Sequence, residues 1–162
     1  MDPLAEPARK SDCAAIARIY NQGIDDRLAT FETRRRSARE VEGWLRSGHP
    51  VVVVREGGAV RAFAACSEYR PRDCYRDIAE FSVYVAREAR GRGLGGVALD
   101  ALAEAALAAG LRKLVSRVFV ENAPSRRLLA RQGFREVGTY RRHGRLDGAW
   151  RDVVIVERLL DE

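Results

Sequence analysis

The first half of the chain carries two amphipathic patterns. Apolar residues recur every three or four positions along residues 11–25 and, over a shorter stretch, along residues 37–45. This spacing places them on one face of a helix, so we predict two helices. The pair Ser11-Asp12 can cap the first, and the motif Ser37-Ala38-Arg39-Glu40 fits a capping box at the start of the second. Residues 1–10 show no such period and are expected to form an irregular lead-in.

Three runs that we predict to be extended follow these helices, and the first of them is β-branched. Residues 51–55 and 60–69 flank the pair Gly57-Gly58, and two extended runs joined in this way predict a β-hairpin. A polar loop over residues 70–76 then leads to a third strand over residues 78–85. The middle of the chain is therefore expected to be β-rich.

Helices and strands alternate in the second half. Gly110 closes a helix rich in alanine and leucine, and Pro124 stands in the first turn of another helix, where proline is tolerated. In order, the predicted elements are a helix over 94–109, a strand over 114–120, a helix over 122–132, and strands over 134–140 and 149–159. This order predicts one domain over residues 1–162 with an α/β (α+β) fold, in which a mixed sheet carries helices on both faces.

Composition excludes several classes of protein. The 162 residues are 46% apolar and 32% charged, as in a globular domain with one core. The net charge of +6 comes from arginines interleaved with acids, and no nucleic-acid-binding motif accompanies them, so nucleic acid is not an expected partner. No apolar run approaches the roughly 20 residues that span a bilayer. The acidic start does not resemble a signal peptide, so we expect a cytoplasmic protein without membrane contact.

Cysteine and histidine are too few and too scattered for a metal site. Cys13, Cys66 and Cys74 follow no paired spacing, and His49 and His143 are the only histidines of the sequence. Zinc sites and disulfide frameworks both depend on regular spacing of these residue types. We therefore expect no metal and no disulfide.

The candidate chemistry centres on a glycine-rich loop. Residues 90–96 read Arg-Gly-Arg-Gly-Leu-Gly-Gly and connect a predicted strand to a predicted helix. Glycines let the backbone approach a ligand closely, and free N–H groups at a helix N-terminus form an anion site. Arg90 and Arg92 add forked donors for phosphate oxygens. The loop therefore predicts a cofactor that carries a diphosphate.

Two common diphosphate motifs fit this loop poorly. Gly91, Gly93 and Gly96 match the G-x-G-x-x-G fingerprint of dinucleotide-binding folds. However, that fingerprint normally opens the domain, whereas a hairpin and two helices precede it here, and residues 111–117 lack the acid expected to bind the ribose. A P-loop is excluded because no Gly-Lys-Ser/Thr follows. A nicotinamide enzyme is thus the weaker interpretation.

A third pattern fits the loop better. Arg90, Gly93 and Gly95 match Arg-x-x-Gly-x-Gly, and Asn122-x-x-Ser125 stands at the head of the next helix. Together with the order of elements, these motifs resemble the GCN5-related N-acetyltransferase (GNAT) superfamily across essentially the whole chain. The stretches that resemble its phosphinothricin N-acetyltransferase branch, which includes arsinothricin-resistance acetyltransferases, are residues 30–31, 70–75, 79–85 and 148–153.

The resemblance implies a GNAT fold with a splayed sheet, and acetyl-CoA as co-substrate. Backbone groups of the glycine loop would hold the pyrophosphate, and those of the preceding strand would pair with the pantetheine arm. Asn122 would bind near the thioester, although its position also fits a plain helix cap. The residues implied for the cofactor are Val83, Tyr84, Val85, Arg90, Gly91, Arg92, Gly93, Leu94, Gly95, Gly96, Asn122 and Ser125.

The resemblance also places the acid–base chemistry. It implies Glu80 as the general base, directly or through water, because an ammonium must lose a proton before it can attack a thioester. The branch carries a second polar residue, a histidine, where this chain has Asp147, and the usual tyrosine acid of the superfamily is replaced by Leu129. Either Asp147 takes the polar role or Glu80 acts alone. Tyr140 and Tyr84 are the remaining candidates for a general acid.

The branch acetylates the α-amino group of glutamate-like acids that bear a phosphinate, arsinate or sulfoximine group. Arg72 and Tyr75 match positions implied to hold such a small-molecule substrate, and Phe31 matches one that walls the pocket. A homodimer is implied as well. Two alternatives stay open: a peptide or protein N-acetyltransferase of the same fold, and a CoA-binding module without catalysis.

Overall fold

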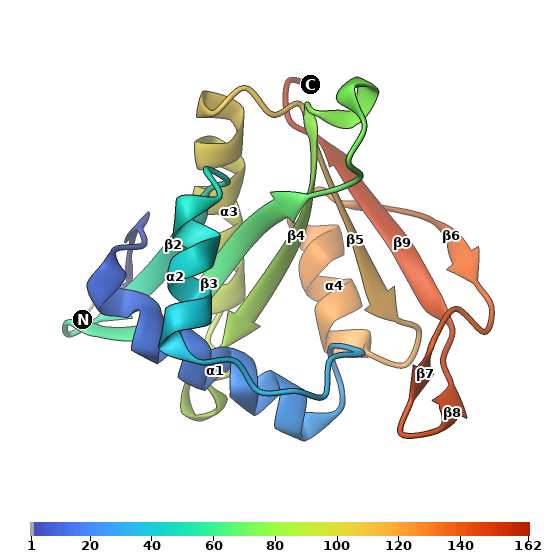
Figure 1. Ribbon diagram of the computed structural model, residues 1–162, viewed down its shortest axis with the longest axis horizontal. Helices are drawn as coiled ribbons and strands as arrows, with labels where there is room; N and C mark the ends of the chain where they lie inside the picture. Colours follow the sequence, from blue (N-terminus) through green and yellow to red (C-terminus); the bar gives the residue numbers. More distant parts are fainter. Residues whose placement is uncertain (1) are drawn as a thin grey trace.

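The computed structural model describes residues 2–162, which form a seven-stranded mixed sheet with helices on both faces (Figure 1). Met1, the first residue of the predicted lead-in, lies outside the described residues. Across the sheet the strands follow the order β1-β2-β3-β4-β5-β9-β6. Their bounds are β1 Leu4–Pro7, β2 Val51–Glu56, β3 Ala59–Glu68, β4 Ile78–Val85, β5 Lys113–Phe119, β6 Arg135–Tyr140 and β9 Val153–Leu159.

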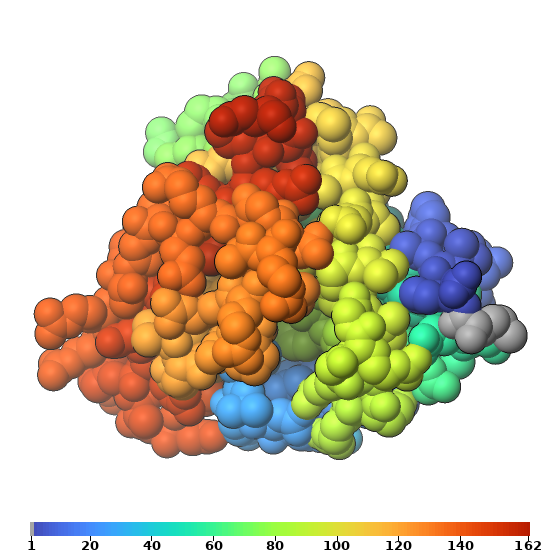
Figure 2. All heavy atoms as spheres, turned by 180° about the vertical axis from the view of Figure 1, so that it is seen from behind, coloured from blue at the N-terminus to red at the C-terminus, as the bar shows by residue number. Residues whose placement is uncertain are grey.

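Helices α1 and α2 cover one face of the sheet, and α3 and α4 cover the other (Figures 1 and 2). Short 3-10 turns precede α1, β4 and the glycine loop. The α-helices are α1 Cys13–Asp26, α2 Ala38–Arg46, α3 Leu94–Ala108 and α4 Ala123–Arg131. The predicted capping box at α2 is confirmed, because Ser37 Oγ accepts a hydrogen bond from the Glu40 N–H at 3.2 Å.

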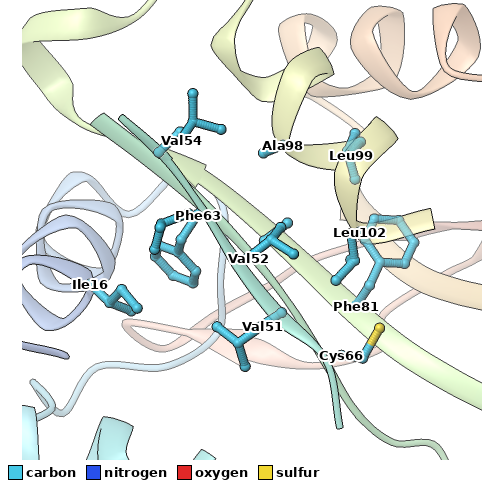
Figure 3. Close-up of a cluster of buried hydrophobic side chains, with 14 of the residues drawn as sticks. Ile16, Val51, Val52, Val54, Phe63, Cys66, Phe81, Ala98, Leu99 and Leu102 are labelled. Carbon is cyan, nitrogen blue, oxygen red and sulfur yellow. The ribbon is translucent and has the colours of Figure 1, made fainter. Parts of the chain in front are cut away.

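The apolar core lies on both sides of β2 and β3. Figure 3 shows Val52 directed toward Leu99 and Leu102 of α3, whereas Phe63 is directed toward Ile16 of α1. All five side chains are at most 2% exposed. Because successive strand residues face opposite sides of a sheet, the near-continuous apolar runs of β2 and β3 serve two helical layers at once.

The sheet splays between β4 and β5. This parallel pair stays in register over three residue pairs and ends at Glu80 opposite Val115. β4 then continues for five residues to Val85. At the point of divergence the Ser116 hydroxyl donates to the carbonyl oxygen of Phe81 at 2.9 Å, in place of a ladder bond. The strand edge of β4 beyond Glu80 is thus separated from β5.

An aromatic cluster fixes α1 against β4. Tyr20 of α1 meets the ring of Tyr84 edge-on, with 5.1 Å between centroids, and Phe63 stacks on Tyr84 at 5.5 Å. A Cβ at Gly23 would lie 2.6 Å from Tyr84 Cε1, so only glycine allows this approach. The contact brings the C-terminal end of α1 to the splayed end of β4.

Three sequence predictions need correction. The lead-in contains β1, which pairs with β2 along the edge of the sheet, and a strand of four residues is too short to show a period. Asp12 does not cap α1 with its side chain; its carboxylate instead accepts from the Arg9 N–H and pairs with Arg55. The strand predicted over 149–159 is divided, because Ala149–Trp150 (β8) pairs with Arg145–Leu146 (β7) in a separate hairpin that precedes β9.

Candidate active site

A cavity of about 420 Å³ opens where β4 leaves β5. It lies between the N-terminal ends of α3 and α4, and the C-terminal end of α1 closes its lower side. Figure 2 shows this hollow between the yellow-green start of α3 and the orange α4. Ten of the twelve residues implied for the cofactor line it; the two exceptions are Arg92 and Gly96.

The glycine loop lines one end of the cavity. Gly91 and Gly93 both have positive φ angles, +79° and +81°, and Gly93 is the N-cap of α3. The first N–H groups of a helix lack partners within the helix, and the aligned peptide dipoles make this end positive. Since Gly93, Leu94 and Gly95 line the cavity, these donors are available to a bound anion.

The other two loop glycines serve packing between helices. A Cβ at Gly95 would lie 2.9 Å from Leu128 Cδ2, and a Cβ at Gly96 would lie 2.7 Å from Gln132 Nε2. Both contacts are with α4 or the residue that ends it. The glycines of this motif therefore divide into a pair that sets the loop conformation and a pair that lets α3 and α4 approach.

The two arginines of the loop have different surroundings. Arg90 lines the cavity, and its Nη1 lies 2.8 Å from Asp26 Oδ2 at the end of α1. Arg87 binds the other oxygen of Asp26 at 2.7 Å, and this hydrogen bond is the main cause that lowers the pKa of Asp26. Arg92 pairs with Glu56 on β2 instead. Arg90 is thus the arginine placed to meet a phosphate in the cavity.

Asn122 connects the start of α4 to the segment that follows α1. Its Oδ1 accepts from the Ser125 N–H at 3.3 Å, which confirms the helix-cap interpretation. Its Nδ2 donates to the carbonyl oxygen of Leu28 at 3.1 Å, so it also holds the segment that follows α1. Asn122 lines the cavity as well, and its role as a cofactor ligand stays a prediction.

A second cavity of about 60 Å³ extends the first along the splay. The two share Val83, Tyr84 and Asn122, and the smaller one reaches Ser82 and Arg117. The pair of cavities therefore runs along the freed edge of β4 toward the point where β4 and β5 meet.

Glu80 stands at that point. Its side chain is 31% exposed, and Oε1 lies 3.4 Å from Arg70 Nη1 and 3.2 Å from Arg117 Nη2. Both guanidinium groups donate to the same carboxylate oxygen and so hold the Glu80 side chain in position. Arg70 falls in the stretch over residues 70–75 that resembles the branch, but the sequence alone assigns it no role, and Arg117 lies on a distant strand without a local motif.

The residues expected to hold the substrate fall on two sides of Glu80. Arg72 lies over the ring of Tyr75 at 5.8 Å, on the loop that leads into β4. Phe31 meets Phe119 of β5 edge-on, with 4.8 Å between centroids. Phe119 is two residues beyond Arg117 and therefore shares its face of β5. Phe31 contacts Phe119, and Arg117 on the same face of β5 contacts Glu80, so Phe31 and Glu80 lie along one face of this strand.

The positions considered for a second catalytic residue besides Glu80 make contacts of their own or are buried. Asp147 is 60% exposed and pairs with Arg27 at 2.9 Å. Leu129, at the position of the tyrosine acid, is buried. Tyr140 is exposed on β6, and its ring is tilted against that of His143 with 4.5 Å between centroids. Burial raises the pKa of Tyr84, so its hydroxyl stays protonated through the neutral range.

Two negative findings complete the description of residues 2–162. No group of three or more histidine, cysteine, aspartate or glutamate side chains is arranged to hold a metal ion in this part of the chain. Among the helices formed by these residues, none has the length and apolar character needed to cross a bilayer.

Comparison with known proteins identifies the family. The model of the acetyltransferase (GNAT) family matches residues 16–134. The chain is 35% identical to phosphinothricin N-acetyltransferase of Streptomyces coelicolor, over 95% of this chain and 94% of that protein. It is 33% identical to the L-methionine sulfoximine/L-methionine sulfone acetyltransferase of Salmonella typhimurium, over 96% and 93%.

Solved structures agree with these matches. An acetyltransferase of Salmonella typhimurium, determined with its cofactor acetyl-CoA, superposes with a TM-score of 0.94 at 31% identity and covers 100% of this chain and 96% of its own. The expected fold, with its splayed mixed sheet, is thereby confirmed. The chain belongs to the GNAT family and is an acetyl-CoA-dependent N-acetyltransferase.

Proposed function

We propose that this enzyme acetylates the α-amino group of a small amino acid of the phosphinothricin, arsinothricin or methionine sulfoximine type, with Glu80 as the general base. The observation that carries the proposal is the position of Glu80 between two guanidinium groups, at the end of the splay that holds the cavity. The names of two full-length relatives support the substrate class.

The cavity has the donors and the shape that acetyl-CoA needs. The N–H groups of residues 93–95 would hold the pyrophosphate, with Arg90 beside them. Backbone groups of Val83 and Val85 would hydrogen-bond the pantetheine arm as an added strand, because β5 has left this edge of β4. The bound cofactor supplies an acetyl group activated as a thioester.

Glu80 provides the proton acceptor for the amine. An amino acid carries an ammonium group near neutral pH and cannot attack until that group loses a proton. The Glu80 carboxylate accepts this proton, either directly at a separation of about 2.6–3.2 Å or through one water. Arg70 and Arg117 hold the carboxylate in place beforehand.

Arginines on the β3–β4 loop bind the acidic end of the substrate. Arg72 is exposed on this loop and offers a planar fork that matches a carboxylate. The ring of Tyr75 packs under the guanidinium group of Arg72. Phe31, which contacts Phe119 of β5, supplies an apolar wall. This arrangement suits a small amino acid better than a peptide chain. A homodimer in the cytoplasm accompanies the proposal, and sedimentation of the purified protein tests its oligomeric part.

Thiol release from acetyl-CoA tests the function. The panel consists of phosphinothricin, arsinothricin, methionine sulfoximine, glutamate and a short peptide with a free N-terminus. We expect release with one or more of the three analogues and none with the peptide. Release with the peptide alone would reassign the enzyme to the peptide or protein N-acetyltransferases. Tight binding of acetyl-CoA without thiol release in the presence of any of these amines would indicate a CoA-binding module without catalysis.

A further inference from the structure

The Glu80 site holds more positive charge than is needed to balance one carboxylate. Arg70 reaches Glu80 Oε1 from the loop between β3 and β4, and Arg117 reaches the same oxygen from β5 on the other side. One guanidinium is sufficient to balance one carboxylate. The second leaves a net charge of +1 at this point, before Arg72 on the same loop as Arg70 is considered.

Two acids on the sheet side of Glu80 are paired with other cations. Glu157 of β9 pairs with Lys113 and with Arg135. The acid that follows β5, Glu121, pairs with Arg151. Neither of these two acids therefore neutralises the second guanidinium group beside Glu80.

Arg117 is also placed to touch a small molecule. It lines the smaller cavity along the splay, and its side chain is 39% exposed. It shares its face of β5 with Phe119, whose ring contacts that of Phe31 edge-on. Arg117 thus lies on the sheet side of the Glu80 site, whereas Arg70 reaches Glu80 from the loop and Arg72 stands two residues further along that loop.

The spacing of the two guanidinium groups suits a molecule with two acidic ends. Since 3.4 Å and 3.2 Å can add to no more than 6.6 Å, Arg70 Nη1 and Arg117 Nη2 lie within 6.6 Å of each other. In a glutamate-like amino acid, four bonds of about 1.5 Å separate the α-carboxyl carbon from the acidic centre on the γ carbon, a span of about 5 Å. Its amine is carried by the α carbon, one bond from the α-carboxyl carbon.

We propose that Arg117 is a specificity-determining residue that binds an acidic group on the side chain of the substrate, while Arg70 and Arg72 bind its α-carboxylate. This inference rests on the proposed function and narrows it. The preferred substrate is an amino acid with an ionised γ-phosphinate, arsinate or carboxylate. Amino acids with a neutral sulfone or sulfoximine bind the same site without the contact to Arg117.

The test compares one acidic and one neutral substrate. Values of kcat/KM are measured for phosphinothricin and for methionine sulfone with the unaltered enzyme and with Arg117→Ala, Arg117→Gln and Arg70→Ala. Loss of a charge-assisted contact corresponds to roughly a 10- to 100-fold decrease. We expect Arg117→Ala and Arg117→Gln to lower kcat/KM for phosphinothricin by this factor more than for methionine sulfone, mainly through KM. Arg70→Ala should lower both alike.

The matched control is Arg135→Ala, which removes another exposed arginine from an ion pair on a strand. It should leave the ratio of the two kcat/KM values unchanged. A second readout uses competitive inhibitors without an amine. Glutarate should bind the unaltered enzyme about tenfold more tightly than pentanoate, which has one acid on a chain of the same length, and this preference should vanish in Arg117→Ala.

The possible failures are distinguishable. Equal losses for both substrates in the Arg117 variants, or equal inhibition by glutarate and pentanoate, would overturn the assignment of Arg117 and leave the enzyme an amino-acid acetyltransferase. Absence of turnover of either amino acid by the unaltered enzyme would overturn the proposed function, and this inference with it.

Discussion

Substitution of Gly93 by alanine separates the role of the glycine loop in binding from its role in folding. Gly93 is the N-cap of α3 with φ +81°, and a Cβ there would meet no atom within 4 Å. The cost to the folded chain is therefore that of a left-handed backbone alone, about 1–2 kcal/mol. For a protein of this size the melting temperature should fall by about 2–8 °C.

The cost to cofactor binding is larger, because the added methyl group enters the space beside the first N–H groups of α3. Loss of one hydrogen bond from such a donor to a charged phosphate corresponds to about 1.5–3 kcal/mol. Calorimetric titration with acetyl-CoA should therefore show Kd raised by roughly 10- to 150-fold. The fall in kcat/KM should follow the change in Kd.

Gly110→Ala is the matched control. Gly110 follows the other end of α3, has φ +91°, and likewise has open space at its Cβ. It should lower the melting temperature by a similar amount and leave the Kd for acetyl-CoA unchanged. If both variants weaken acetyl-CoA binding equally, or if Gly93→Ala binds as tightly as the unaltered enzyme, the anion site at the start of α3 is refuted.

Three further predictions concern the scaffold. Arg55→Met leaves the carboxylate of Asp12, which is 3% exposed, without its guanidinium partner; urea denaturation should show a loss of about 3 kcal/mol, and a change below about 1 kcal/mol would count against a buried pair. Burial acts to raise the pKa of Asp12, but hydrogen bonds from Arg55 and the Arg9 backbone outweigh it and lower the pKa. The stabilisation from Asp12 is therefore present above about pH 3.9 and is lost as the pH falls through the folded-state pKa. Asp12→Asn should for this reason lose less stability in acid than the unaltered protein. Superimposable profiles of stability against pH would contradict this. Leu102→Ala empties a fully buried position between α3 and the sheet and should cost about 2–5 kcal/mol in the same assay, whereas a cost below 1 kcal/mol would show that the site collapses.

Local pattern was sufficient for most of the elements. Periodicity, the Gly57-Gly58 turn and the cap at Ser37 predict helices and strands that the structure confirms within a few residues. The strand over 78–85 and the helix from residue 94 have their starts where the sequence indicated. These elements depend on neighbours along the chain, which is the information that a single sequence carries.

Contacts between distant segments could not be predicted in this way. β1 exists because it pairs with β2, 45 to 51 residues later, as with Ala5 opposite Val54. Gly95 and Gly96 were interpreted as part of a ligand loop, yet their lack of a side chain accommodates α4. In the site, Arg117 meets Glu80 only because β5 lies parallel to β4, so that a residue 37 positions later in the sequence completes the surroundings of Glu80.

The central claim is that Glu80 removes the proton from an amino-acid substrate. The most direct measurement follows formation of the N-acetyl amino acid by mass spectrometry, with acetyl-CoA and phosphinothricin, for the unaltered enzyme and for Glu80→Gln. Glutamine keeps the size of the side chain and one oxygen for Arg70 and Arg117 but cannot act as the base. The account predicts a kcat lower by about 10²- to 10⁴-fold, with the Kd for acetyl-CoA changed by less than about twofold. An unchanged kcat in Glu80→Gln would contradict it.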